Sequence, residues 1–122
     1  MTDRELLEFA AKAAGLELDT KYGAFHDGSG RWWLSVKVGN EWHHWNPLAN
    51  DGDALRLAVK RRFHINIFSA CSSEGIDSPG FVEIWCGDCD PIHTEYVEGG
   101  DYETATRRAI VRAAAEIGKG ME

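Results

Sequence analysis

The chain has 122 residues, and 20 Asp and Glu against 13 Lys and Arg give it a net charge of −7 at neutral pH. With 43% hydrophobic and 27% charged residues it has the composition of one folded domain, which excludes a disordered tail and a coiled coil. The acidic total disfavours direct nucleic-acid binding. Because the sequence shows neither a long apolar run nor a signal sequence, we expect a cytoplasmic protein without a membrane span.

The first predicted element is a helix over about residues 3–14. Thr2 and Glu5 have the spacing of a capping box, in which each side chain can accept a hydrogen bond from a backbone N–H of the first turn. Apolar residues then recur at helical spacing, and Gly15 stands where a helix commonly ends.

Three strands and a second helix follow in the predicted order. Runs rich in aromatic and β-branched residues, separated by Gly-containing turns, predict strands at 22–26, 31–38 and 41–45. Pro47 ends this meander because proline cannot donate a hydrogen bond in a sheet. The Asn and Asp residues of 50–53 are typical of a helix N-terminus, so we expect the second helix to begin there.

The C-terminal half repeats this pattern. Alternating residues predict a strand at 63–70, a loop at 71–80 and then a hairpin of two strands at 81–86 and 92–97. An Ala-rich helix is expected from Asp101 to Ile117. The predicted fold class is α+β, an antiparallel sheet covered by helices in the order α-β-β-β-α-β-β-β-α. Neither repeats nor linkers divide the chain, so we expect a single domain over residues 1–122.

One segment carries a resemblance to a known group of proteins. Residues 45–59 read WNPLANDGDALRLAV, and 105–115 form an Ala-rich helical segment. This combination resembles small tailed-phage accessory proteins and is similar to the phage ABA sandwich domain family. The resemblance implies a bacteriophage protein that acts in the host bacterial cytoplasm, in host takeover or against host defence. Its motif contains no reactive group.

The sequence contains one C-x-x-C motif, Cys86 to Cys89. Two thiols at this spacing can bind one metal ion, and Cys71 and His93 could complete a Cys3His zinc site. The segment also resembles the thioredoxin active-site string, but Pro91 leads into a predicted strand and not into a helix. The alternative is that the thiols bind nothing. We therefore expect no cofactor, and keep zinc or redox chemistry as an alternative.

Other catalytic patterns are missing from the sequence. It has no nucleophile elbow, phosphate-binding glycine loop or Glu-x-x-His metal motif. Adjacent residues on a strand point to opposite sides, so His43 and His44 cannot chelate one metal ion together. We predict that the protein is not an enzyme.

Tryptophan is concentrated in the predicted hairpin region. Four of the five Trp residues lie there. Neighbouring strand positions face opposite sides, so at least one of the first two should lie outside the helix-covered core. Exposed Trp is typical of binding surfaces. We predict a partner or homo-oligomer surface, the alternative being a wholly internal aromatic core, at Trp32, Trp33, Trp42 and Trp45.

A second candidate surface is acidic. Between Phe63 and Thr106 the sequence has nine Asp and Glu residues and not one Lys or Arg. Such a surface could steer association with a basic groove on a host protein, the alternative being a merely solubilising face. The acidic ridge is predicted at Glu83, Asp88, Asp90 and Glu95.

Basic residues of the two later helices offer a third candidate. If these helices lie side by side, their guanidinium groups could hold phosphate. The residues are Arg56, Arg107, Arg108 and Arg112.

The leading functional hypothesis is an accessory protein that binds a host or defence-system protein. The alternative is an oligomeric sponge that sequesters a nucleotide-derived immune signal.

Overall fold

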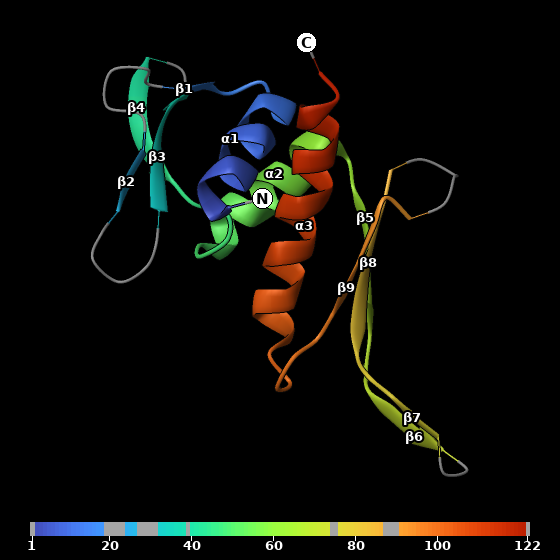
Figure 1. Ribbon diagram of the computed structural model, residues 1–122. Helices are drawn as coiled ribbons and strands as arrows, with labels where there is room; N and C mark the ends of the chain where they lie inside the picture. The colour runs from blue at the N-terminus through green and yellow to red at the C-terminus, as the bar shows by residue number, and fades with distance from the viewer. Residues whose placement is uncertain are drawn as a thin grey trace.

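The computed structural model describes residues 2–18, 24–26, 32–38, 40–73, 76–86 and 91–121 (Figure 1). Its three helices are α1 (Asp3–Ala13), α2 (Asp51–Arg61) and α3 (Tyr102–Lys119). The strands before α2 are β1 (Glu17–Leu18), β2 (Ala24–His26), β3 (Trp32–Val38) and β4 (Glu41–Trp45). Those after it are β5 (His64–Phe68), β6 (Cys71–Ser73), β7 (Ile76–Ser78), β8 (Phe81–Trp85) and β9 (His93–Tyr96).

The α+β class and the predicted order of the main elements are confirmed. Three short strands were not predicted. β1 pairs with the C-terminal end of β3, and β6 pairs with β7 inside the segment expected to be a loop. Strands of two or three residues are too short to show a periodic pattern, so only their pairing defines them.

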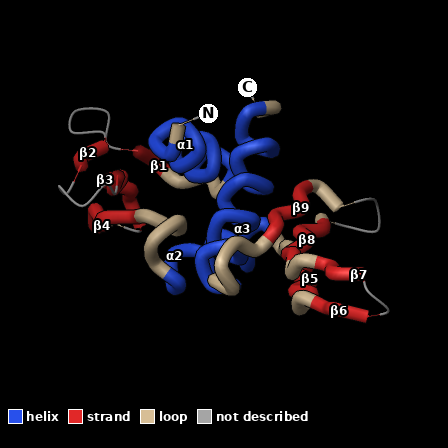
Figure 2. Tube along the Cα trace, turned by 60° about the horizontal axis from the view of Figure 1, so that its bottom comes forward, coloured by secondary structure: helices blue, strands red, loops and turns tan. Residues whose placement is uncertain are grey.

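The strands form separate antiparallel sheets and not one. β3 pairs with β4 on one edge and with β1 and β2 on the other, whereas β8 lies between β5 and β9. The helices lie between these two sheets, in both views of the chain (Figures 1 and 2). The β6–β7 ribbon continues from β5 and β8 and extends away from the helices (Figure 1). Each main sheet therefore has one face toward the helices.

Side-chain caps fix where the helices begin. The Thr2 hydroxyl accepts from the Glu5 N–H at 3.2 Å, and Asn50 accepts from the Asp53 N–H at 2.9 Å. Asp101 caps α3 in the same way. These residues were expected at helix starts from sequence alone, because a cap is a local interaction.

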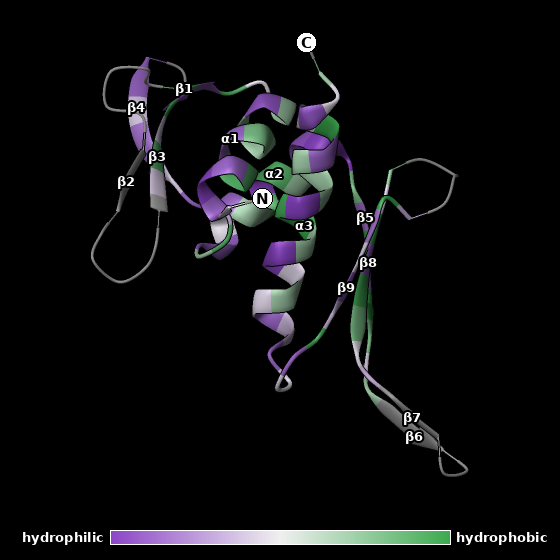
Figure 3. Ribbon diagram, in the orientation of Figure 1, coloured by the Kyte–Doolittle hydropathy of each residue, from purple (hydrophilic) through white to green (hydrophobic). Residues whose placement is uncertain are grey.

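The core is the helical layer together with the inward row of each sheet. Leu34 and Val36 of β3 and Val82 and Ile84 of β8 are almost completely buried. Small residues let α1 and α3 approach closely: a Cβ built on Gly118 would collide with the backbone carbonyl of Phe9. Figure 3 shows apolar colour on the helices where they meet and mostly hydrophilic colour on β4. No helix in the described part of the chain combines the length and hydropathy needed to cross a membrane.

Candidate functional site

The outer face of the β5–β8–β9 sheet carries a row of aromatic side chains. The strand register places Phe68 opposite Phe81 and Phe81 opposite Tyr96. The rings of Phe68 and Phe81 stack with centroids 4.4 Å apart, and the Tyr96 ring lies 6.2 Å from that of Phe81. Phe68 is 42% exposed and Tyr96 is 63% exposed. Because Val82 points inward to the core, this row faces away from α3.

A carboxylate and a further aromatic residue share this face. Glu83 lies two positions after Phe81 and pairs with Asn66 and Thr94 in the neighbouring strands. The indole N–H of Trp85 donates to a Glu83 oxygen at 3.4 Å. We call this surface the aromatic–acidic face and define it by Phe68, Phe81, Glu83, Trp85 and Tyr96.

The predicted acidic ridge is wrong for Glu95. The register places Glu95 opposite Val82, so it lies on the helix-facing side, and its side chain is only 14% exposed. There Arg112 donates to both carboxylate oxygens, at 2.8 and 3.0 Å, and His93 lies 2.9 Å from one of them. Glu83 and Glu95 differ because side chains alternate along a strand and the register is offset by one residue. Asp88 and Asp90 lie outside the described residues.

The tryptophans of the first sheet do not form one surface. Trp45 is 5% exposed and belongs to the core, which corrects its prediction as a partner-binding residue. Trp42 is 47% exposed. Trp33 is partly buried. It lies four positions before Lys37, which pairs with Trp42, so Trp33 and Trp42 are separated by about 13 Å along the strand direction. The side chain of Trp32 lies outside the description.

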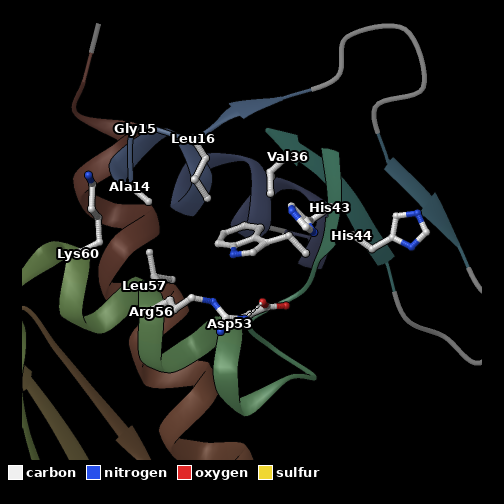
Figure 4. A pocket seen from close by; sticks show the side chains of 11 residues that line it. Ala14, Gly15, Leu16, Val36, His43, His44, Asp53, Arg56, Leu57 and Lys60 are labelled. Carbon is white, nitrogen blue, oxygen red and sulfur yellow. Dashed lines mark hydrogen bonds and ion pairs between the residues drawn. The ribbon is translucent and has the colours of Figure 1, made fainter. Parts of the chain in front are cut away.

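A cavity of about 550 Å³ lies between the first sheet, the end of α1 and α2 (Figure 4). Leu16, Val36, Trp45 and Leu57 form its apolar part. Arg56, Lys60, His43 and Asp53 are its ionisable lining residues, and Figure 4 shows His44, which also borders it, with its ring turned away.

Asp53 is held by the segment that precedes α2. One of its carboxylate oxygens accepts from the N–H of Asn46 at 3.0 Å, and the other accepts from Arg56 at 2.7 Å. The Asn46 side chain in turn accepts from the N–H groups of Leu48 and Ala49, at 2.9 and 3.2 Å. Asn46 and Asp53 of the segment 45–59 therefore belong to a structural hydrogen-bond network beside the cavity.

The four arginines predicted to hold phosphate are not all brought to one place. Arg107 donates to the carbonyl of Leu48 at 3.0 Å and to Asp51 at 2.6 Å, and so ties α3 to the start of α2. Arg112 binds Glu95. Arg56 lines the cavity beside α2, whereas Arg108 and Arg112 line a separate, smaller one together with four acidic or hydroxyl side chains, Glu95, Glu98, Asp101 and Thr104. Their positions on different sides of the helical layer do not support one shared phosphate site.

The predicted zinc site is described only in part. Cys86 is an exposed free thiol, and His93 is engaged with Glu95. Cys89 and the side chain of Cys71 lie outside the description. Within the described residues no group of three or more His, Cys, Asp or Glu residues is placed to hold a metal ion.

Comparison with known proteins gives no relative. No family model matches the chain, and searches of curated proteins and of solved structures find no similar protein. The resemblance of residues 45–59 to phage accessory domains therefore stays a prediction.

The aromatic row was not predicted from the sequence. The three strands that carry Phe68, Phe81 and Tyr96 were predicted, but their alignment was not. Alternation along 81–86 could have indicated that Phe81 lies opposite in direction to Val82 and Ile84. Only the strand register, which depends on contacts far apart in sequence, shows that the three rings are neighbours.

A second exposed apolar area lies on α2 and β5. Leu55 is 62% exposed, Val59 is 66% exposed and Ile67 is 54% exposed. Leu55 and Ile67 border a shallow groove of about 320 Å³ that also includes Tyr102. These residues provide aliphatic surface without a stacked ring, so they are a useful comparison for the aromatic–acidic face.

Proposed function

We propose that this chain is a phage accessory protein that acts by binding a protein of the bacterial host, and that the partner docks on the aromatic–acidic face. The observation that carries the proposal is the aromatic row of Phe68, Phe81 and Tyr96 on the helix-free side of its sheet. The phage origin and the host cytoplasm follow from the sequence resemblance and belong to the same proposal.

A partner that covers the aromatic row would release water from its apolar surface. The sheet holds the aromatic rings in a row, so their side chains lose little conformational entropy when a partner binds. A partner that covers their large apolar area therefore gains free energy at little further entropic cost. Tyr96 is the most exposed ring of the row. Residues of this kind are common at the centre of protein interfaces.

Charge indicates what kind of partner fits. Glu83 lies beside the row, and the sequence from Phe63 to Thr106 contains no Lys or Arg. A basic partner surface would be attracted to this part of the chain, and repulsion would disfavour an acidic one. The proposed partner therefore presents apolar side chains flanked by Lys or Arg.

The test uses immobilised protein and a bacterial lysate, with quantitative mass spectrometry of what is retained. Tyr96→Ser removes the exposed ring, and Glu83→Lys reverses the charge beside it. The matched controls are Trp42→Ser, an exposed aromatic residue on the other sheet, and Val59→Ser, from the exposed aliphatic area. We expect a partner that both face variants lose and both controls retain.

Two results would contradict the proposal. One is a partner retained equally by wild type, Tyr96→Ser and Glu83→Lys. The other is a partner lost in Trp42→Ser alone, which would transfer the binding site to the first sheet. Circular dichroism of each variant shows whether a loss of binding reflects a loss of fold.

A further inference from the structure

The cavity beside α2 has the size and composition of a small-molecule site. Its volume of about 550 Å³ lies within the range of about 300–1,000 Å³ that is usual for ligand pockets. The apolar part comes from segments far apart in the sequence: Leu16 after α1, Val36 of β3, Trp45 of β4 and Leu57 of α2. The labelled side chains of Leu16, Val36 and Leu57 point into a common space between the helices and the first sheet, whereas His44 points away from it (Figure 4).

Its charge is opposite to that of the chain as a whole. Arg56 and Lys60 are one helical turn apart on α2, so both lie on the side that faces the cavity. Among the described lining residues Asp53 is the one carboxylate, and both of its oxygens already accept hydrogen bonds. Two cations and one carboxylate leave a net positive lining in a chain of net charge −7. His43 of β4 adds a ring whose Nε2 atom lies 3.5 Å from a carboxylate oxygen of Glu41.

We propose that this cavity binds a small amphipathic anion, a molecule with a phosphate or carboxylate head and an apolar body. The head lies against Arg56 and Lys60, where charge-assisted hydrogen bonds are strong. The body lies on the apolar lining and displaces water from Leu16, which is partly exposed. The site is on the opposite side of the helical layer from the aromatic–acidic face, so it does not depend on the proposed protein partner.

Two probes distinguish the sources of such an anion. Adenosine monophosphate represents nucleotides, and decanoate represents aliphatic carboxylates of lipid origin. Binding to the full chain is measured by isothermal titration calorimetry and by ligand-observed NMR. We expect one of these probes to bind, and its identity shows which source supplies the body of the natural ligand.

Matched variants locate the binding. Lys60→Gln removes one cation from an exposed position, and Arg56→Gln removes the other. Each should weaken binding about tenfold or more, as expected for the loss of a hydrogen bond to a charged group. Arg108→Gln removes the same charge from a different cavity and should change the affinity less than about twofold.

Lys60→Gln keeps the test decisive if Arg56→Gln disturbs Asp53. The proposal is overturned if neither probe binds at millimolar concentration. It is also overturned if a probe binds but Lys60→Gln leaves its affinity unchanged, or if Arg108→Gln weakens it as much as Lys60→Gln does. An unchanged unfolding curve for Lys60→Gln confirms that the fold is intact.

Discussion

The phenol oxygen of Tyr102 accepts a hydrogen bond of 2.9 Å from the backbone N–H of Ala70. Tyr102 is the first residue of α3, and Ala70 lies between β5 and β6. The Tyr102 ring also lies against Gly80, where an added Cβ would be 2.5 Å from the Tyr102 hydroxyl oxygen and 2.9 Å from two of its ring carbons. The N–H of Val97 donates to the Gly80 carbonyl at 2.8 Å. The start of α3 therefore contacts the end of β5 and the start of β8, at the point where the β6–β7 ribbon leaves the sheet.

A double-mutant cycle tests this contact. Gly80→Ala should destabilise the protein by about 1–3 kcal/mol, because the new methyl group overlaps the Tyr102 ring. In a Tyr102→Ala background the same change should cost much less. Urea unfolding of the four proteins gives the free energies. Equal costs in both backgrounds would contradict the contact and would assign the effect to the backbone of Gly80.

The close approach of α1 and α3 gives a second prediction. Gly118→Ala places a methyl group against the Phe9 carbonyl, which cannot move without shifting α1. We expect a loss of about 1–3 kcal/mol or more in the free energy of unfolding. Gly120→Ala is the control, since its nearest neighbours to a new Cβ are 3.6 and 3.9 Å away. A chemical-denaturation series in which both variants behave alike would show that the helices separate easily.

The network that precedes α2 gives a third prediction. Asp53→Ala removes the acceptor used by the N–H of Asn46, which is 2% exposed. Removing the acceptor of a buried donor should cost about 1–3 kcal/mol. Asp51→Ala, which breaks the pair between Arg107 and an 80% exposed carboxylate, should cost less than about 1 kcal/mol. Thermal unfolding compares the two variants, and the reverse order would mean that the α2–α3 tie outweighs the network.

The cap of α3 gives a fourth prediction, on pH. Hydrogen bonds from the Thr104 N–H and then its hydroxyl, with the charge of Arg107, lower the pKa of Asp101 from its ordinary value. A carboxylate with a lowered folded-state pKa stabilises the fold above its unfolded value of about 3.9, and this stabilisation disappears as the pH falls through the folded value. The advantage of wild type over Asp101→Asn should therefore shrink as the pH is lowered through this range.

The experiment measures urea unfolding of both proteins from about pH 6 to about pH 2. Thr104→Val is the matched control, because it keeps the backbone N–H and removes only the hydroxyl. The difference in the free energy of unfolding between Thr104→Val and the double variant with Asp101→Asn should depend on pH less steeply than the difference between wild type and Asp101→Asn. A difference that stays constant over the whole range would show that the charge of Asp101 does not act through the cap.

Local interactions were the predictable part of this fold. Thr2, Asn50 and Asp101 were placed at helix starts because a cap is formed with residues only three positions away. The predicted strand bounds 31–38 and 41–45 leave two residues between these strands, and the pairing of Val38 with Glu41 confirms this spacing. In these places the residue types alone determine the backbone.

For the candidate site, the sequence predicted the types of residue but not their arrangement. Exposed aromatic residues and acidic charge were both expected, but Trp45 proved to be buried and Glu95 faces Arg112. Which side of a strand a residue occupies depends on the pairing of distant segments, and a shift of one position reverses the result. The division into two sheets depends in the same way on which distant segments pair, because β8 pairs with β5 and β9 and not with any strand before α2.

The helical layer between two sheets that share no strand also has a consequence for divergence. Residues that hold the layer together point inward, whereas Trp42 on one sheet and Tyr96 on the other point outward. Either outer surface can thus accumulate substitutions while the other keeps its role. Descendants of such a chain would conserve the alanine-rich centre and exchange their binding specificities one face at a time.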